Sequence, residues 1–172
     1  MTDPAPRPAP GWLKRVLRVP EGCGTKFYVL FRLGQIAGLN RRAPWPVHWT
    51  SIVINGQKVQ LGARTFPGDS PHCYINGHNG IIVGDDCNLA PGVGLISANH
   101  DLYDNSRHLE APPIRLGART WIGMNAVILP GVELGENTIV GAGAVVTKSF
   151  PDGWQVIGGN PARVLRKLDP PA

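Results

Sequence analysis

The sequence predicts an all-β fold: a triangular coil of short parallel strands, preceded by a short helical segment and interrupted by one extruded loop. An aliphatic residue recurs at every sixth position, and tight-turn residues are frequent, with 22 Gly and 17 Pro. The 172 residues, 42% of them hydrophobic, suffice for one domain with a substantial core. Short, repeated, turn-rich elements are therefore expected throughout.

The chain before the repeat is predicted to fall into two parts. Residues 1–11 alternate proline with other residues and are expected to form an extended, disordered tail, not a signal peptide. Residues 12–49 are predicted to form a basic helical segment of one or two helices, broken near Pro20 and the glycines that follow it. Within it, residues 12–42 hold a single acid, Glu21, and a formal net charge of +6; the bases are Lys14, Arg15, Arg18, Lys26, Arg32, Arg41 and Arg42.

The apolar run "KFYVLFRLGQIAGL" in this segment has two interpretations. It is read first as a helix that packs on the first coil or on a neighbouring subunit. The alternative is an interfacial helix that lies on a membrane with its basic residues toward lipid headgroups. No run of about 18 apolar residues is present, so no membrane span is expected. Nucleic acid is not an expected partner.

The repeat itself lies in the second half of the chain. Its aliphatic positions are Leu116, Ile122, Ile128, Leu134, Val140 and Val146. Four residues after each of the first five stand Thr120, Ala126, Val132, Thr138 and Ala144. A period of six fits neither a helix nor an ordinary strand, but it fits a prism with three flat sides, each sending one aliphatic and one smaller residue inward. Glycines after the aliphatic positions are expected to turn the corners, and coils to stack about 4.8 Å apart.

The repeat begins upstream at Val83 and is broken twice. Leu95 and Leu116 are 21 residues apart, and Leu61 and Val83 are 22 apart, and neither spacing is a multiple of six. The break between Leu95 and Leu116 predicts an extruded loop at about 101–113. The prism is expected to span residues 50–168, with a short tail at 169–172, and function is expected where irregular loops leave the stiff coil.

Three motifs give the chain a family resemblance. "LGARTWIGMNAVILPGVELGENTIVGAGAVVTKSF", the closing "GGNPARVLRKL" and "SANHD" before the loop resemble the hexapeptide-repeat acyltransferases, which fold as left-handed parallel β-helices. The galactoside, maltose and polysaccharide O-acetyltransferases are the most similar group. The resemblance implies an acetyl-CoA-dependent O-acetyltransferase that acts directly on a hydroxyl of a sugar or polysaccharide precursor. It also implies a homotrimer with sites between subunits.

By this resemblance His100 is the catalytic residue, a general base at the loop junction. A neutral imidazole can take the proton of an acceptor hydroxyl as it attacks the thioester. A backbone carbonyl is expected to orient the ring, because the adjacent Asp101 should point to the opposite face. A loop histidine without a role is the alternative. Four further polar residues are interpreted as loop surface or acceptor contacts: Asp104, Arg107, His108 and Glu110.

The substrates have their own candidate residues. Asn76 or Asn79 is expected to assist the acceptor, unless both simply form Asn-Gly-type turns. The resemblance implies acetyl-CoA binding by Trp121, Gly123, Met124, Ala142, Thr147, Lys148, Arg163 and Arg166. Trp121 and the small residues would line the pantetheine, and the two arginines would meet phosphates as permanently charged planar donors. The alternative to phosphate binding is that Lys148, Arg163 and Arg166 belong to a solvated basic edge.

Other chemistries are less well supported. The three cysteines, Cys23, Cys73 and Cys87, lack metal spacing, and no histidine stands five residues from His100 as in the zinc hydratases of this fold. No metal is therefore expected. An antibiotic O-acetyltransferase and a non-catalytic scaffold remain alternatives. The expected location is the cytoplasm, with peripheral contact at the inner face of the membrane as a hypothesis from the basic segment.

Overall fold

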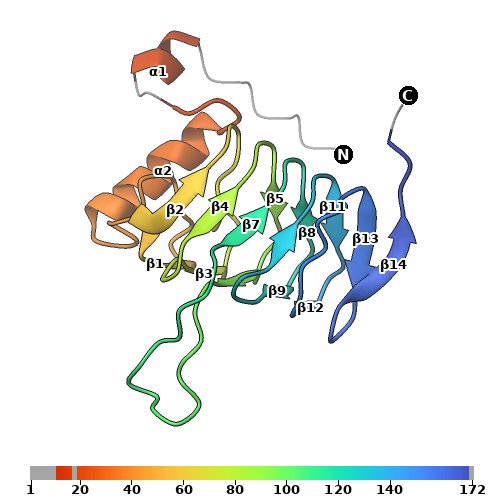
Figure 1. Cartoon of the computed structure of the whole chain (residues 1–172). Helices are drawn as coiled ribbons and strands as arrows, with labels where there is room; N and C mark the ends of the chain where they lie inside the picture. Colours follow the sequence, from red (N-terminus) through yellow and green to blue (C-terminus); the bar gives the residue numbers. More distant parts are fainter. Residues whose placement is uncertain (1–10, 17–18, 171–172) are drawn as a thin grey trace, which may run out of the picture.

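The computed structural model describes residues 11–16 and 19–170 (Figure 1). The expected tails at 1–11 and 169–172 lie largely outside the described residues. Two short helices, α1 (Gly11–Val16) and α2 (Thr25–Ile36), precede the strands, and the break between α2 and α1 contains Pro20 and Gly22. The helix α2 lies at the end of the prism beside β1 and β2, whose bounds are given below.

Three parallel sheets form the sides of the prism. The first face holds β1 (Ile52–Ile54), β3 (Tyr74–Asn76), β6 (Gly94–Ile96), β9 (Val127–Ile128) and β12 (Val145–Val146). The second face holds β2 (Val59–Leu61), β4 (Ile81–Val83), β7 (Ile114–Leu116) and β10 (Glu133–Leu134). The third face holds β5 (Asn88–Leu89), β8 (Trp121–Ile122), β11 (Thr138–Val140), β13 (Gln155–Gly158) and the antiparallel β14 (Arg163–Lys167). The chain visits the faces in turn, so the predicted all-β left-handed parallel β-helix is confirmed.

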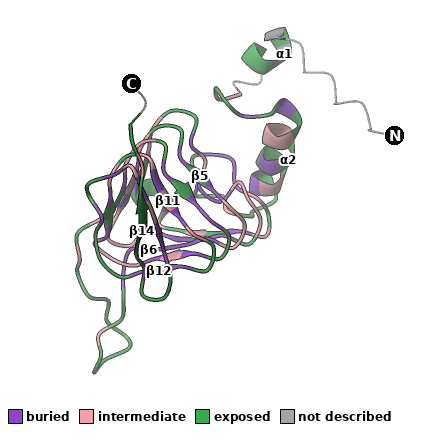
Figure 2. Ribbon diagram, turned by 90° about the vertical axis from the view of Figure 1, so that its right-hand side faces the viewer, coloured by how far each residue is buried: buried purple, intermediate pink, exposed green. Residues whose placement is uncertain are grey.

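The six-residue pattern builds the core of the prism. Every aliphatic position from Leu116 to Val146 is at most 3% exposed, and the five smaller positions between them are at most 1% exposed. Residues 18 apart face each other on adjacent coils, as Ile128 and Val146 do in β9 and β12. Figure 2 shows the buried residues lining the inside of the coils. The repeat therefore works as the sequence predicts, with one aliphatic and one smaller side chain inward on each side.

The glycines that directly follow the aliphatic positions act differently from the expectation, whereas Gly131 and Gly143 at other corners do have left-handed backbone. The left-handed backbone at the corners belongs to residues such as Arg119 (φ 58°) and Asn137 (φ 52°), and not to Gly117. A Cβ atom on Gly117 would lie 2.4 Å from the backbone nitrogen of Glu136 on the next coil. Gly117 is thus required because two backbones approach closely there, and this corrects the simple turn argument.

Both breaks in the repeat have a structural explanation. Leu61 and Val83 pair directly in β2 and β4, so the first coil simply contains 22 residues. The second break is a hairpin between β6 and β7, here called the 97–113 hairpin, which projects away from the prism (Figures 1 and 2). It leaves at the corner between the first and second faces. Its residues are exposed over nearly the whole length.

Other elements cover the two ends of the prism. At the N-terminal end, Phe31 of α2 is buried, and Nε2 of Gln35 donates to the carbonyl oxygens of Ala43 and Trp45 at 3.2 and 2.7 Å. At the other end, β14 turns back along β13 with a bulge between Val156 and Ile157. The β-helix thus has a distinct structure at each end.

Candidate active site

The stem of the 97–113 hairpin pairs His100 with His108. The backbone N–H of Asp101 donates to the carbonyl of Arg107 at 2.9 Å, and that of Leu109 donates to Asn99 at 2.8 Å. These two bonds flank His100 and His108, which face each other in an antiparallel bridge. In such a non-hydrogen-bonded pair the side chains are close and on the same side. The sequence suggested that His100 ends one side of the coil. It lies instead within the stem of the hairpin.

A backbone carbonyl fixes the orientation of the His100 ring. Its Nδ1 lies 2.6 Å from the carbonyl oxygen of Asn105, five residues further along the hairpin. Because a carbonyl only accepts, Nδ1 carries the proton in this contact, and the lone pair of the neutral ring is on Nε2. Asp101 does not hold the ring, since its Oδ1 accepts from the backbone N–H of Tyr103 at 2.8 Å. This arrangement leaves His100 with an exposed basic nitrogen.

Two further histidines lie close to His100: the ring of His108 contacts it with the planes tilted by 38°, and the ring of His78 stacks on His108. The ring centroids of His100 and His108 are 4.3 Å apart, and those of His108 and His78 are 4.4 Å apart with planes at 17°. Desolvation, and then the neighbouring His100 and His78, hold the pKa of His108 below its usual value. The sequence interpretation left His108 among the surface residues. The turn-forming residues Asp104, Asn105 and Ser106 lie between His100 and His108, and they were the signal in the sequence that could have predicted a hairpin there.

The structure separates the two asparagine candidates. The amide nitrogen of Asn79 donates to the carbonyl of Leu109 at 2.9 Å, and its backbone N–H donates to Oγ of Ser97 at 2.9 Å. Asn79 thus ties the hairpin to the preceding coil. Asn76 is buried in β3, and its Oδ1 accepts from the backbone N–H of His78 at 3.1 Å, so its amide nitrogen is the one that an acceptor could meet. Of the two, Asn76 fits the acceptor role better.

The third face carries a row of outward residues that ends in an arginine. Register pairs link Trp121 to Ile139, Ile139 to Val156, and Val156 to Arg166. At about 4.8 Å per strand, Trp121 and Arg166 are about 14 Å apart. The Trp121 side chain is half exposed, and Arg163 and Arg166 form no ion pair with any described residue. An open aromatic surface and two free guanidinium groups therefore share this face.

The corner between the third and first faces brings together three of the predicted cofactor residues. Gly123 packs so closely on the next coil that a Cβ atom would lie 2.7 Å from the backbone nitrogen of Ala142. The carbonyl of Met124 accepts from the backbone N–H of Gly143 at 2.8 Å, and the Met124 side chain is half exposed. Gly123 is thus buried between coils, and the exposed small residues of this corner are Ala142 and Gly143, beside the flexible thioether of Met124.

Thr147 and Lys148 lie elsewhere on the prism. They follow β12 and so occupy the corner between the first and second faces, two coils beyond the base of the hairpin. Nζ of Lys148 lies 5.7 Å from the centre of the Phe150 ring. The eight predicted cofactor residues thus lie in two separate places on one chain. Six lie on the third face and its edge with the first face, and two lie at the corner between the first and second faces, from which the hairpin with His100 projects.

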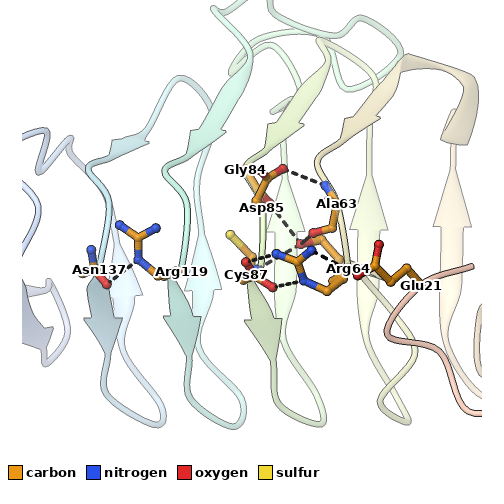
Figure 3. Close-up of polar contacts among 10 residues, drawn as sticks. Glu21, Ala63, Arg64, Gly84, Asp85, Cys87, Arg119 and Asn137 are labelled. Atoms are coloured by element: carbon orange, nitrogen blue, oxygen red, sulfur yellow. Dashed lines mark hydrogen bonds and ion pairs between the residues drawn. The ribbon is translucent and has the colours of Figure 1, made fainter.

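The corner between the second and third faces is held by polar side chains (Figure 3). Arg64 donates to both carboxylate oxygens of Asp86 on the next coil, at 2.6 and 2.5 Å, and Arg119 donates to Asn137 at 3.0 Å. A cavity of about 250 Å³ opens beside Arg64 and Asp69. Burial is the main cause that raises the pKa of Asp69 to about 6. This corner is remote from the hairpin and braces the coil.

Cysteine and metal chemistry find no support in the described part of the chain. Cys23, Cys73 and Cys87 are buried and free, and desolvation is the largest cause that raises the pKa of each thiol. Such thiols are poor nucleophiles. Among residues 11–16 and 19–170 no cluster of three or more potential ligands is placed to hold a metal ion. None of the helices in these ranges has the length and hydropathy needed to cross a membrane.

Sequence comparisons identify relatives of this chain. The family "Bacterial transferase hexapeptide (six repeats)" matches residues 113–148. Nodulation protein L of Rhizobium meliloti is 34% identical over 162 residues, which cover 91% of this chain and 84% of that protein. A Dictyostelium discoideum protein named as an acetyltransferase is 52% identical over 91 residues, or 51% of this chain. That match spans about half of the Dictyostelium protein, 47% of its length.

Solved structures with the same fold include two acetyltransferases. A maltose O-acetyltransferase from Clostridium difficile 630 superimposes with a TM-score of 0.60 and 30% identity, covering 70% of this chain and 64% of that one. A galactoside acetyltransferase in complex with coenzyme A gives a TM-score of 0.59 at 23% identity, covering 84% of this chain and 82% of that one. The second likeness, at its lower identity, is one of fold.

Proposed function

Because the chain belongs to the hexapeptide-repeat acyltransferases, we propose that it transfers an acetyl group from acetyl-CoA to a hydroxyl of a sugar or polysaccharide precursor. The observation that carries the proposal is the 2.6 Å contact between Nδ1 of His100 and the carbonyl of Asn105, which leaves Nε2 as a base. A relative named maltose O-acetyltransferase supports the sugar hydroxyl as acceptor.

The chemistry requires no covalent enzyme intermediate. Nε2 of His100 takes the proton of the acceptor hydroxyl while the oxygen forms a bond to the acetyl carbon. The carbon–sulfur bond then breaks, and the departing thiolate receives the proton from the imidazolium. The carbonyl of Asn105 keeps its hydrogen bond to Nδ1 throughout and stabilises the charged ring. The buried, high-pKa cysteines agree with direct transfer.

The third face and its edge fit coenzyme A. The exposed backbone at Ala142 and Gly143 can admit a pantetheine arm, because both residues are small and a Cβ on Gly143 would meet no atom within 4 Å. The exposed indole of Trp121 offers an apolar surface beside it, and Arg163 and Arg166 suit the phosphates. Acetyl-CoA supplies the activated thioester when bound there.

A homotrimer would complete this site. His100 projects from one corner of the prism, whereas most of the proposed cofactor residues lie on the third face and its edge. Exposed apolar side chains on the first face, Ile52, Ile54 and Tyr74, and on the third face, Trp121, suit a head-to-tail contact that closes into a ring. The hairpin of one subunit would then face the coenzyme A of the next. Light scattering after gel filtration tests this, and a monomer that is fully active would exclude it.

An acceptor screen tests the function itself. The full chain is incubated with acetyl-CoA and a panel of mono- and oligosaccharides, antibiotics with free hydroxyls, and amino sugars, and free thiol is measured. Mass spectrometry of the product then locates the acetyl group. Transfer to a sugar oxygen supports the proposal, and transfer to an amine or an antibiotic alone replaces it. Absence of transfer to every acceptor would favour a non-catalytic scaffold.

We place the protein in the cytoplasm, where acetyl-CoA is available, with peripheral contact at the inner face of the membrane. On α2, Leu33 and Ile36 are 58% and 81% exposed, and Arg41 and Arg42, which follow the helix in sequence, are exposed as well. Apolar and basic side chains together suit an anionic lipid surface. Co-sedimentation with phosphatidylglycerol vesicles should fall for Leu33→Ser/Ile36→Ser and persist for the exposed hairpin variant Leu102→Ser. Equal pelleting of all three proteins would end the membrane hypothesis.

A further inference from the structure

His100 lies on a segment that is exposed to solvent, which is an unusual setting for a base that needs a fixed position. The hydrogen bond from Nδ1 to Asn105 holds one edge of its ring. Asn105 belongs to the same hairpin, so this bond alone does not fix the ring relative to the rigid coil. The second restraint on His100 is the ring of His108, whose centroid is 4.3 Å away.

His108 is itself connected to the prism. Its ring also stacks on that of His78, with centroids 4.4 Å apart, and His78 belongs to the turn that follows β3. The backbone N–H of His78 is held by the buried Asn76, and the neighbouring Asn79 donates to Leu109, next to His108 in sequence. A continuous series of contacts therefore leads from the core of the coil to the ring of His100.

We propose that His108 is a positioning residue, which holds the His100 ring in place by direct ring contact, with the planes tilted by 38°, and is backed by the stacked ring of His78. The inference rests on the proposed function of His100 and deepens it. The ring contact restrains His100 while the residue stays exposed, so the base is oriented without being buried. The lowered pKa of His108 suits this role, because a charged neighbour would disturb a base that must itself accept a proton.

Two substitutions at one position separate ring contact from other roles. His108→Ala removes the ring, and we expect kcat to fall about 10- to 100-fold with both KM values unchanged, as for a displaced catalytic group. His108→Phe retains a planar ring, and we expect it to keep kcat within about threefold of the wild type. Circular dichroism shows whether each variant folds, and His72→Ala, an exposed histidine outside the stack, is the matched control.

A double-mutant cycle tests the role of His78. If His78 acts through His108, His78→Ala alone lowers kcat, but it adds nothing to His108→Ala. Additive losses would mean that His78 acts independently, and the proposed series of contacts would be wrong. Wild-type kcat in His108→Ala, or an equal loss in His108→Phe, would overturn positioning by ring contact.

Nitrogen NMR provides a readout that does not depend on turnover. In the wild type the ring of His100 should show the tautomer protonated at Nδ1, and in His108→Ala a mixture of tautomers, whereas His108→Phe should resemble the wild type. An unchanged tautomer in all variants contradicts the positioning role. If instead His100 proves dispensable for acetyl transfer while the tautomer still responds to His108, the proposed function fails and the positioning contact stands.

Discussion

Nδ1 of His100 donates to the carbonyl oxygen of Asn105 within one hairpin, so the base and the group that orients it belong to the same exposed element of structure. A glutamine at position 100 keeps the size and a hydrogen-bonding end but cannot act as a base. We expect His100→Gln to lower kcat by about 10²- to 10⁴-fold, the usual range for general-base catalysis, with little change in KM. Initial rates of thiol release measure this, and His72→Gln is the control. Wild-type turnover in His100→Gln would assign the base to another group.

The C-terminal strand allows a matched test of phosphate recognition. Arg163 and Arg166 are exposed without a carboxylate partner among the described residues, whereas Nζ of Lys167 is paired with Asp152 at 2.7 Å. Arg163→Gln/Arg166→Gln should raise the KM for acetyl-CoA about tenfold, as expected from the loss of one or two charge-assisted hydrogen bonds, and leave kcat unchanged. Lys167→Gln should change neither. Equal effects of the two variants would indicate general charge attraction and not a phosphate site.

The corner glycines give a test of coil packing. Gly117→Ala would place Cβ 2.4 Å from the backbone nitrogen of Glu136, so neighbouring coils must move apart. We expect it to lower the free energy of unfolding by about 2 to 4 kcal/mol. Gly143→Ala meets no atom within 4 Å but has φ +68°, and should cost about 1 kcal/mol. Urea denaturation gives both values.

Gly94 supplies the control for these two variants. A Cβ there would make only ordinary contacts, at 3.5 Å from Val127, and the backbone is not left-handed. Gly94→Ala should therefore change the free energy of unfolding by less than about 1 kcal/mol. If Gly117→Ala is as mild as Gly94→Ala, close approach of the coils is not what requires glycine.

Asp69 links the stability of the fold to pH. Its pKa is about 6 in the folded protein, mainly because of burial, against an ordinary value of 3.8 for an aspartate side chain. The folded state therefore holds a proton that the unfolded state releases, so the contribution of Asp69 to stability is greatest below about pH 4 and falls as pH rises to about 6. Asp69→Asn should stabilise the protein at pH 7.5 by about 1 to 2 kcal/mol and flatten this pH dependence. The exposed Asp169→Asn should do neither, and thermal unfolding from pH 4 to 7.5 compares the two.

The fold could be predicted because the repeat is local. Ile128 and Val146 meet because they are 18 residues apart, so their contact follows from the period without any knowledge of the rest of the chain. The corner chemistry could not be predicted in the same way. Whether Gly117 is required for its φ angle or for its small size depends on how closely Glu136 approaches, and this distance is a property of the packed coils.

The candidate site was predictable in part for the same reason. The break in the repeat predicted an extruded loop with His100 at its junction with the coil; the structure has the loop, but His100 lies inside its stem, paired with His108. Inside the hairpin the six-residue period no longer applies, and the pairing of His100 with His108 depends on the turn at Asp104, whose Oδ1 accepts from the backbone N–H of Ser106 at 3.0 Å. The contact of His78 with His108 joins two segments 30 residues apart, and no local pattern predicts it.

The antiparallel return of β14 has a consequence for solubility. A stack of parallel coils has no natural stopping point, because its last turn offers the same unpaired edge as every turn before it. By folding back on Gln155–Gly158, β14 occupies that edge on the third face with a strand of opposite direction and five exposed residues. The strand β14 thus blocks end-to-end pairing of the prism. Without it, the free edge of one molecule could pair with a strand of another and lead to fibrous polymers.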